Sequence, residues 1–308
     1  MNGLRKGKIL VVGSTNTDMV VRTERLPRPG ETVLGGTFLM NPGGKGANQA
    51  VAAARLGADV IFVCKTGNDM FGITTRQQLA QEGIDTRFVF IDDHNPSGVA
   101  LISVDSRAEN TIVVASGANA NLLPLDVAKA ETALDDCDIV LMQLETPMTT
   151  IEYVAAEAAK RGKRTVLNPA PGAALSPQLL KSLYLITPNE TEAEIITGIR
   201  IHNAEIEAEA ARSIRAMGVQ NVIITLASRG AYICNDRFDE AVPAQKVRAV
   251  DTTAAGDVFN GALVVALSEG KSLEEAVRFA SRASAISVTR MGAQSSIPYR
   301  SEVDRFVP

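Results

Sequence analysis

The chain has 308 residues, of which 45% are hydrophobic and 21% are charged, and its formal net charge is −4. These proportions are typical of a globular protein and disfavour a disordered chain. The 24 glycines and 13 prolines are an ordinary share of the residues and exclude a collagen-like chain. The net negative charge argues against nucleic acid as a partner, because a phosphate backbone is bound by a basic face. No stretch approaches the ~18 consecutive apolar residues of a membrane span, so we expect no membrane partner.

The N-terminus and the cysteines predict a cytoplasmic protein. The apolar stretch after the basic N-terminus covers only residues 9–12, whereas a signal peptide needs an apolar region of ~7–15 residues. The cysteines, Cys64, Cys137 and Cys234, are three in number, lie far apart and form no CxxC pair. An odd number of widely spaced cysteines favours reduced, buried thiols.

Short apolar runs alternate with helical stretches along most of the chain. The apolar runs, which are typical of strands buried on both faces, lie at residues 8–13, 60–65, 139–143, 165–168, 184–187, 221–226 and 247–251. The helical stretches lie at residues 47–56, 70–81, 149–160, 204–217 and 258–267. This alternation predicts a three-layer α/β/α fold with a mainly parallel central sheet.

Two segments break the alternation, at residues 18–41 and 97–116. They show no helical pattern, and we expect short strands at 19–23, 32–39, 98–104 and 110–115. Their mixed apolar and polar composition suits a sheet with one exposed face. Neither segment is long enough to fold alone. We therefore expect residues 1–308 to form one domain, with a small protruding β-sheet that acts as a lid or a dimer contact.

The sharpest motif is Asp251-Thr-Thr-Ala-Ala-Gly-Asp257, between an apolar run and a helix. The small residues at 254–256 allow a tight turn whose N–H groups, at the start of a helix, can bind phosphate oxygens. Phosphate would repel Asp257 unless this carboxylate accepts a proton from a hydroxyl that attacks the phosphorus. The alternative interpretation is an ordinary aspartate cap of a helix.

The second motif is Pro42-Gly-Gly-Lys-Gly-Ala-Asn48, which leads into a helix. Its glycines allow the backbone to approach a ligand closely, and Lys45 and Asn48 offer polar contacts. It is not a P-loop, because Gly46 stands where that motif needs Ser or Thr. The first strand is not followed by GxGxxG, which argues against a Rossmann dehydrogenase. An ordinary loop with a helix cap remains the alternative.

Polar residues follow several predicted strands. Asn16 and Asp18 follow the first strand, and Glu145, Asn168 and Asn189 follow later ones. In open α/β sheets, ligands bind beyond the carboxyl ends of the strands. Asn and Asp two residues apart suit two adjacent hydroxyls, although each residue alone fits a simple turn equally well.

These motifs together resemble those of the ribokinase-like (phosphofructokinase-B-type) carbohydrate kinases. The likeness covers essentially the whole chain and includes Asn16-Thr-Asp18, Gly43-Gly-Lys-Gly-Ala-Asn48, Gln143-Leu-Glu145, Asn168-Pro-Ala-Pro171, Thr187-Pro-Asn-Glu-Thr-Glu192, Thr225-Leu-Ala-Ser-Arg-Gly230 and the 251–257 run. Ala254 stands where the family usually has a glycine. A Cβ atom narrows this turn only slightly, so we still expect an anion pocket.

The resemblance implies a role for each matching residue. Asp257 would be the general base, beside an anion hole formed by the amides of Ala254, Ala255, Gly256 and Asp257. The sugar would be held by Asn16, Asp18, Gly44, Lys45, Asn48, Glu145 and Asp257. The nucleotide would be held by Asn189, Thr225, Leu226, Ala227, Ser228, Arg229, Gly230, Gly256 and Ser281. Glu192 would serve magnesium indirectly. Potassium would lie near Asp251, Thr253, Ser287, Arg290, Gly292 and Ser296.

The resemblance further implies ATP-dependent phosphorylation of the 5-hydroxyl of D-ribose, with magnesium and potassium, by a homodimer that contacts through the lid. Relatives that act on 2-deoxyribose, a hexose or a nucleoside are the nearest alternatives. A nucleoside acceptor would need a stacking ring, and the predicted lid strands offer only Phe38. A non-catalytic sugar-binding regulator is a further alternative, but it would usually lack the base or the anion hole.

Overall fold

The computed structural model describes residues 6–107 and 109–307. Its central sheet has nine strands in the order β13-β12-β11-β10-β9-β8-β1-β4-β5. Neighbouring strands are parallel except for the pairs β11–β12 and β12–β13, which are antiparallel. The strands are β1 (Lys8–Val12), β4 (Asp59–Gly67), β5 (Val89–Asp92), β8 (Ile139–Met142), β9 (Arg164–Leu167), β10 (Leu185–Ile186), β11 (Asn221–Thr225), β12 (Ala231–Cys234) and β13 (Asp239–Val242).

Helices cover both faces of this sheet, as the alternation along β1 illustrates. Ile9 and Val11 belong to one apolar cluster, while Leu10 and Val12 belong to another on the opposite face. The first cluster includes residues of α1 (Lys45–Arg55), α2 (Met70–Gln81), α9 (Ala255–Ser268), α10 (Leu273–Ser287) and α11 (Arg300–Arg305). The second includes residues of α3 (Pro124–Ala128), α4 (Glu131–Asp136), α5 (Met148–Lys160), α6 (Pro177–Lys181), α7 (Glu190–Thr197) and α8 (Ala204–Ala216). The predicted three-layer fold is therefore confirmed.

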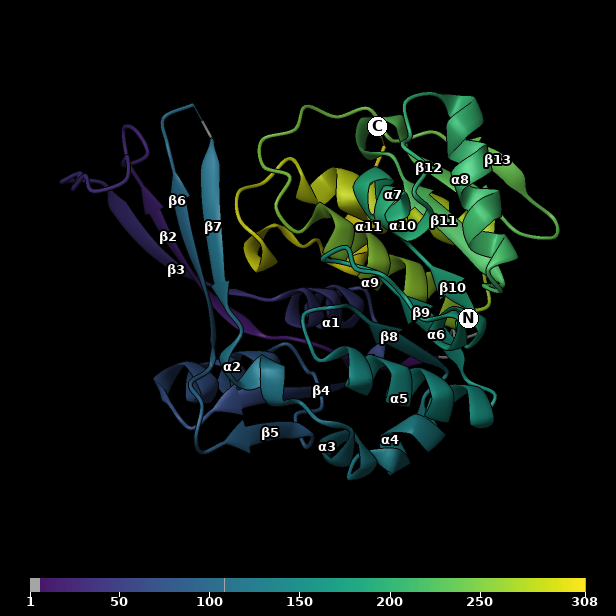
Figure 1. Cartoon of the computed structure of the whole chain (residues 1–308), viewed down its shortest axis with the longest axis horizontal. Coiled ribbons are helices and arrows are strands. Elements are labelled where there is room, and N and C mark those ends of the chain that lie inside the picture. The colour runs from purple at the N-terminus through teal and green to yellow at the C-terminus, as the bar shows by residue number, and fades with distance from the viewer. Residues whose placement is uncertain (1–5, 108, 308) are drawn as a thin grey trace.

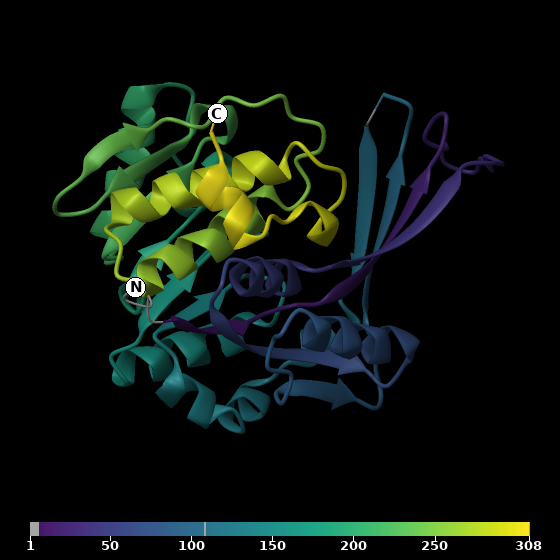
Figure 2. The same cartoon turned by 180° about the vertical axis from the view of Figure 1, so that it is seen from behind.

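A second, four-stranded sheet stands away from the main body (Figure 1). It consists of β2 (Asn16–Arg22), β3 (Thr37–Gly43), β6 (Gly98–Val104) and β7 (Asn110–Ala115), in the order β3-β2-β6-β7. The view from behind shows the same separation (Figure 2). The small sheet expected from the sequence is thus present, with β2 and β6 parallel and the other pairs antiparallel.

Three sequence-based expectations about these elements were wrong. The strand expected at 32–39 begins only at Thr37, because Gly35 and Gly36 have φ of 94° and 116°, which an extended strand does not allow. The run at 247–251 is not a strand, since the N–H groups of Val250 and Asp251 both donate to the carbonyl of Val288. The small sheet also carries exposed apolar side chains on both faces rather than on one.

Some elements were not predicted, of which α10 is the longest. A signal for it was available, because Ser272 and Glu275 have the spacing of a capping box and do cap this helix. The strands β5, β12 and β13 were also missed. Within the described residues, no helix is both long and apolar enough to span a membrane.

Candidate active site

Polar residues from five strands meet at one edge of the central sheet. Asn16 follows β1, Glu145 follows β8, Asn168 follows β9, Asn189 follows β10 and Thr225 ends β11. These five strands are parallel, so their carboxyl ends lie at the same edge. An isolated bridge pairs Asn189 with Thr225. The polar residues that the sequence places after these strands therefore lie at one edge of the sheet.

Helix α9 begins at this edge in a strained turn. Ala254 precedes the helix with φ of 61°, a left-handed conformation that costs a residue with a Cβ atom roughly 1–3 kcal/mol. The N–H of Ala255 donates to the carbonyl of Thr252 at 3.2 Å. The N–H groups of Gly256 and Asp257 have no acceptor among the residues that the structure describes. These two free donors can bind an anion.

The carboxylate of Asp257 is buried beside these donors. Its Oδ2 accepts from Nδ2 of Asn48 at 2.9 Å, and its Oδ1 accepts from Nε2 of Gln49 at 3.0 Å. Burial raises the pKa of Asp257, while Lys45 and the two amide donors oppose this rise. Because both neighbouring amides present N–H groups, they stabilise the ionised form, which is the form that can accept a proton.

Gln49 is a residue of this site that our sequence reasoning missed. It is fully buried, its Nε2 also donates to Oδ1 of Asn168 at 3.0 Å, and its Oε1 accepts from Nε2 of Gln143 at 2.6 Å. A signal was available, since Gln49 stands among the small apolar residues of a helix and directly follows the glycine motif. Gln49 thereby connects Asp257 to the ends of β8 and β9.

The glycine motif packs against residues 13–16, which follow β1. A Cβ atom on Gly44 would be 2.7 Å from the N atom of Asn16, and one on Gly46 would be 2.6 Å from the N atom of Ser14. The φ of 88° at Gly44 also favours glycine. Oε2 of Glu145 accepts from the N–H of Lys45 at 3.0 Å and from the hydroxyl of Ser14 at 2.5 Å. Ser14 was not predicted.

Four carboxylates act on a single ammonium group in this region. Burial would lower the pKa of Lys45, but nearby carboxylates hold it above its usual value: Asp257, Glu145, Glu192 and Asp18. The pKa of Asp18 is raised to about 7 by burial and by the carboxylates of Glu145 and Asp257. Carboxyl groups therefore outnumber the ammonium group four to one in this region.

The residues predicted to hold a nucleotide lie beyond β10 and β11. Asn189 and Glu192 cap α7 reciprocally, each accepting a hydrogen bond from the backbone N–H of the other, and burial raises the pKa of Glu192. The helix η2 (Ala227–Arg229) is exposed and follows the buried Leu226, whose N–H donates to the carbonyl of Gly230.

Two of the residues predicted to hold the nucleotide, Arg229 and Ser281, have their partners elsewhere or lie apart from the rest. The guanidinium group of Arg229 forms ion pairs with Glu190 and Glu207, so it ties η2 to α7 and α8. Ser281 is buried in α10 and has no hydrogen bond to residues 225–230 within the described part of the chain.

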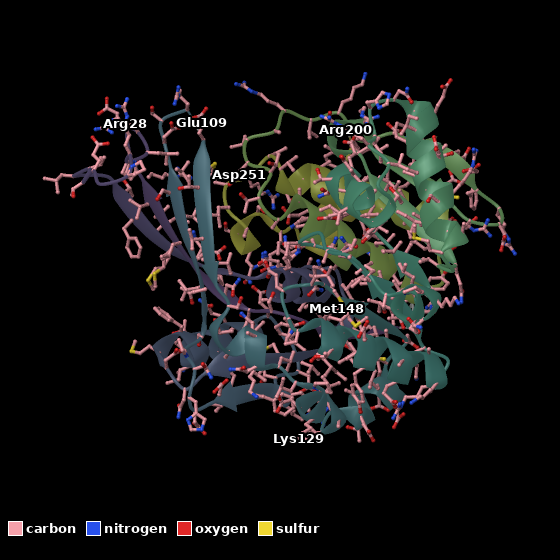
Figure 3. The ribbon with its side chains drawn as sticks, in the orientation of Figure 1. Arg28, Glu109, Lys129, Met148, Arg200 and Asp251 are labelled. Carbon is pink, nitrogen blue, oxygen red and sulfur yellow. The ribbon has the colours of Figure 1, made fainter. Side chains whose placement is uncertain are left out.

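The residues predicted for potassium come from two segments that meet at Asp251. Oδ1 of Asp251 accepts from the N–H and the hydroxyl of Thr253, and Oδ2 accepts from the N–H of Gly292 at 2.8 Å. These bonds outweigh burial and lower the pKa of Asp251. The side chain of Asp251 lies on the side of the main body that faces the small sheet (Figure 3).

The other side chains of this group have local partners. The hydroxyls of Ser287 and Ser296 donate to the carbonyls of Ser284 and Ala293, and Arg290 pairs with Glu302. These residues therefore offer mainly backbone carbonyl oxygens. In the described part of the chain, no three or more His, Cys, Asp or Glu side chains are grouped so that they could hold a metal ion.

An α/β sheet whose carboxyl edge carries a buried carboxylate beside free helix N–H groups suits an enzyme that transfers a phosphoryl group to a hydroxyl. Comparisons with known proteins agree. Residues 6–300 match the pfkB family of carbohydrate kinases. The chain belongs to this family, as its motifs predicted.

Named relatives cover nearly the full length. A ribokinase of Haemophilus influenzae is 46% identical over 299 residues, which are 97% of this chain and 98% of the relative. A deoxyribokinase of Salmonella typhi is 37% identical over 291 residues, or 94% and 95% of the two chains. The structure of an Arabidopsis thaliana ribokinase complexed with ribose and ATP is similar with a TM-score of 0.91 at 33% identity, covering 98% of this chain and 100% of that one.

The Gln49→Leu variant tests the environment of Asp257. Because one donor to the carboxylate is lost, we expect the pKa of Asp257 to rise further, so that the acid limb of the kcat profile moves to higher pH. A hydrogen bond to a charged group contributes ~1.5–3 kcal/mol, so the acid limb should move by about one to two pH units. The measurement is sugar-dependent ADP release across pH. Gln77→Leu, at an exposed position of α2, is the matched control. If the acid limb does not move, Gln49 does not affect the pKa of Asp257.

Proposed function

We propose that this enzyme transfers the terminal phosphoryl group of ATP to the 5-hydroxyl of D-ribose, giving ribose 5-phosphate and ADP. The observation that carries the proposal is the carboxylate of Asp257, which is buried and adjacent to the free N–H groups of Gly256 and Asp257. Among the described residues its bonds come only from N–H donors. The relatives named above, and the ribose and ATP bound in the Arabidopsis structure, support this choice of substrates.

In this proposal, Asp257 takes the proton of the attacking hydroxyl, so that the oxygen becomes a better nucleophile as its bond to phosphorus forms. The turn at 254–257 stabilises the negative charge that develops on the transferred group. The N–H groups of Gly256 and Asp257 are the free donors for this purpose. Asn260 and Ser284 hold the turn in place, because they donate to the carbonyls of Gly256 and Ala255.

The proposed sugar site contains a buried polar atom without a hydrogen-bond partner among the described residues. Oδ1 of Asn48 is buried without a hydrogen-bond partner among the described residues, while its Nδ2 is used by Asp257. A buried acceptor of this kind favours a ligand that brings a hydroxyl. We assign the sugar contacts to Asn16, Asp18, Gly44, Lys45, Asn48 and Glu145.

We assign the nucleotide to Asn189, to the segment Thr225–Gly230 and to Ser281, with Gly256 close to its phosphates. Magnesium fits near Glu192, whose carboxylate is an oxygen donor of the type that this ion prefers. When bound with ATP, magnesium offsets the negative charge of the phosphates. We also propose a cytoplasmic location, which the three free, buried cysteines support.

A potassium ion fits the region of Asp251, Thr253, Ser287, Arg290, Gly292 and Ser296, because the donors are carbonyl and carboxylate oxygens. A cation there would lie behind the turn at 254–257 and would offset charge on the phosphoryl group. We expect the rate to fall when sodium replaces potassium at constant ionic strength. The measurement is ADP release with each chloride salt. An equal rate in both salts would contradict this assignment.

The reaction itself is tested by ADP release with D-ribose, 2-deoxy-D-ribose, D-fructose and a nucleoside at matched concentrations. D-Ribose should give the highest kcat/KM, because a site built to bond a hydroxyl rejects the analogue that lacks it. Asp257→Asn should lower kcat by about 10²–10⁴-fold, the usual contribution of a general base. Calorimetry should show nearly unchanged ribose binding. Asp304→Asn, exposed on α11, is the control.

Two outcomes would overturn parts of this proposal. A higher kcat/KM with 2-deoxy-D-ribose would assign the chain to the deoxyribokinase activity of its Salmonella relative. An active Asp257→Asn variant would remove Asp257 from the role of base.

We propose that the small sheet, approximately residues 18–41 and 97–116, is a lid and also the contact of a homodimer. Asp18 lies on the face of β2 that is opposite to the side chains of Met19 and Val21. We call the face opposite to Asp18 the outer face of the small sheet. The register of the sheet places these apolar side chains on it: Met19, Val21, Phe38, Met40, Leu101 and Val113. Phe38 is 57% exposed and Val113 is 66% exposed in the single chain. An apolar face of this kind favours association.

The Phe38→Asp variant tests the dimer. A charge in the apolar outer face should convert a dimer into a monomer, as measured by sedimentation velocity. Leu34→Asp is the matched control, because Leu34 is 91% exposed but lies outside the strands. A monomeric wild-type protein, or a dimer that Phe38→Asp leaves intact, would contradict the assignment.

A further inference from the structure

The amide of Asn119 is buried where the chain returns from the small sheet to the main body. Asn119 belongs to η1 (Gly117–Asn121), which follows β7, and it is 1% exposed. Its Oδ1 accepts from the N–H of Thr15 at 2.9 Å. Its Nδ2 donates to the carbonyl of Thr15 at 3.0 Å and to Oδ1 of Asn16 at 2.8 Å. Both N–H groups of the Asn119 amide are therefore used within the protein.

The backbone of Thr15 determines which way this amide points. A backbone N–H only donates and a backbone carbonyl only accepts, so Oδ1 of Asn119 must face the former and Nδ2 must face the latter. The second N–H of Asn119 then points at Asn16, which accepts it with its oxygen. Nδ2 of Asn16 faces away and has no hydrogen-bond partner among the described residues. Asn16 is thus a donor toward any ligand.

Strand β6 leaves room for this pair of amides. Gly98 is the register partner of Asn16 on β6. A Cβ atom on Gly98 would lie 2.2 Å from Nδ2 of Asn119 and 2.3 Å from Oδ1 of Asn16. Any larger residue would separate the two amides, so the orientation of Asn16 depends on β2, β6 and η1 together.

We propose that Asn119 is a positioning residue that determines the specificity for the sugar. It holds Asn16 so that Nδ2 donates to a sugar hydroxyl, while Asp18, two residues further on the same face of β2, accepts from one. This inference rests on the proposed function of the same site. A hydroxyl both accepts and donates, whereas the hydrogen of a deoxy sugar does neither. The deoxy analogue would leave polar groups unpaired and would be rejected.

The Asn119→Asp variant tests the inference, because it keeps the shape and replaces the donor by an oxygen. This oxygen would repel the carbonyl of Thr15 and Oδ1 of Asn16, so Asn16 would lose its orientation. We expect KM for D-ribose to rise about tenfold or more and KM for ATP to stay unchanged. The kcat/KM preference for D-ribose over 2-deoxy- or 3-deoxy-D-ribose should collapse. Asn121→Asp is the matched control, since Asn121 lies on the same helix but donates to Asp92.

The outcomes separate this inference from the proposed function. A wild-type enzyme that does not phosphorylate D-ribose refutes the proposed function. A wild-type enzyme that does, together with an Asn119→Asp variant that keeps its preference or loses activity equally with all three sugars, refutes only the role of Asn119. Should Asn119→Asp not fold, Asn16→Asp gives an independent test, because it keeps the acceptor for Asn119 and removes the donor. An unchanged KM for D-ribose in Asn16→Asp would overturn the inference.

Discussion

The hydrogen bonds from helix α1 to the carboxylate of Asp257 are the interaction on which the site depends. Burial raises the pKa of this carboxylate, and a protonated carboxyl group cannot act as a base. Two consecutive amides, Asn48 and Gln49, stabilise the ionised form. They reach Asp257 because α1 and α9 pack closely. A Cβ atom on Gly261 of α9 would lie only 2.6 Å from Cβ of Ala52 on α1.

Helix α1 also joins the residues that we assign to the sugar to those that we assign to the phosphates. Its first residue, Lys45, donates its N–H to Glu145, and three to four residues later the same helix holds Asp257. Asn16 and Asp18 lie on β2, which starts in the site and continues into the small sheet (Figure 1). A shift of the small sheet would therefore act directly on the residues that we assign to the sugar.

Much of the fold and of the candidate site could be predicted because the evidence was local. Apolar runs gave most of the central strands, and the motifs around Lys45 and Asp257 gave the two helix starts. Gln49 and Asn119 could not be assigned roles, since their partners lie 208 and 104 residues away along the chain. The prediction of a strand at 247–251 was wrong, because apolar composition does not reveal that the carbonyl of Val288 is the hydrogen-bond partner of this segment.

The sequence by itself determined the class of fold and the family, and it supplied most of the candidates for the residues that carry chemistry. These follow from the spacing of apolar, small and polar residues within short segments, which constrain the backbone locally. Only the tertiary structure decided what each polar atom does. Asn16 is a donor because the backbone of Thr15 orients Asn119, and Asp257 accepts from N–H groups because two amides of α1 face it. The direction of a hydrogen bond depends on which groups meet in space.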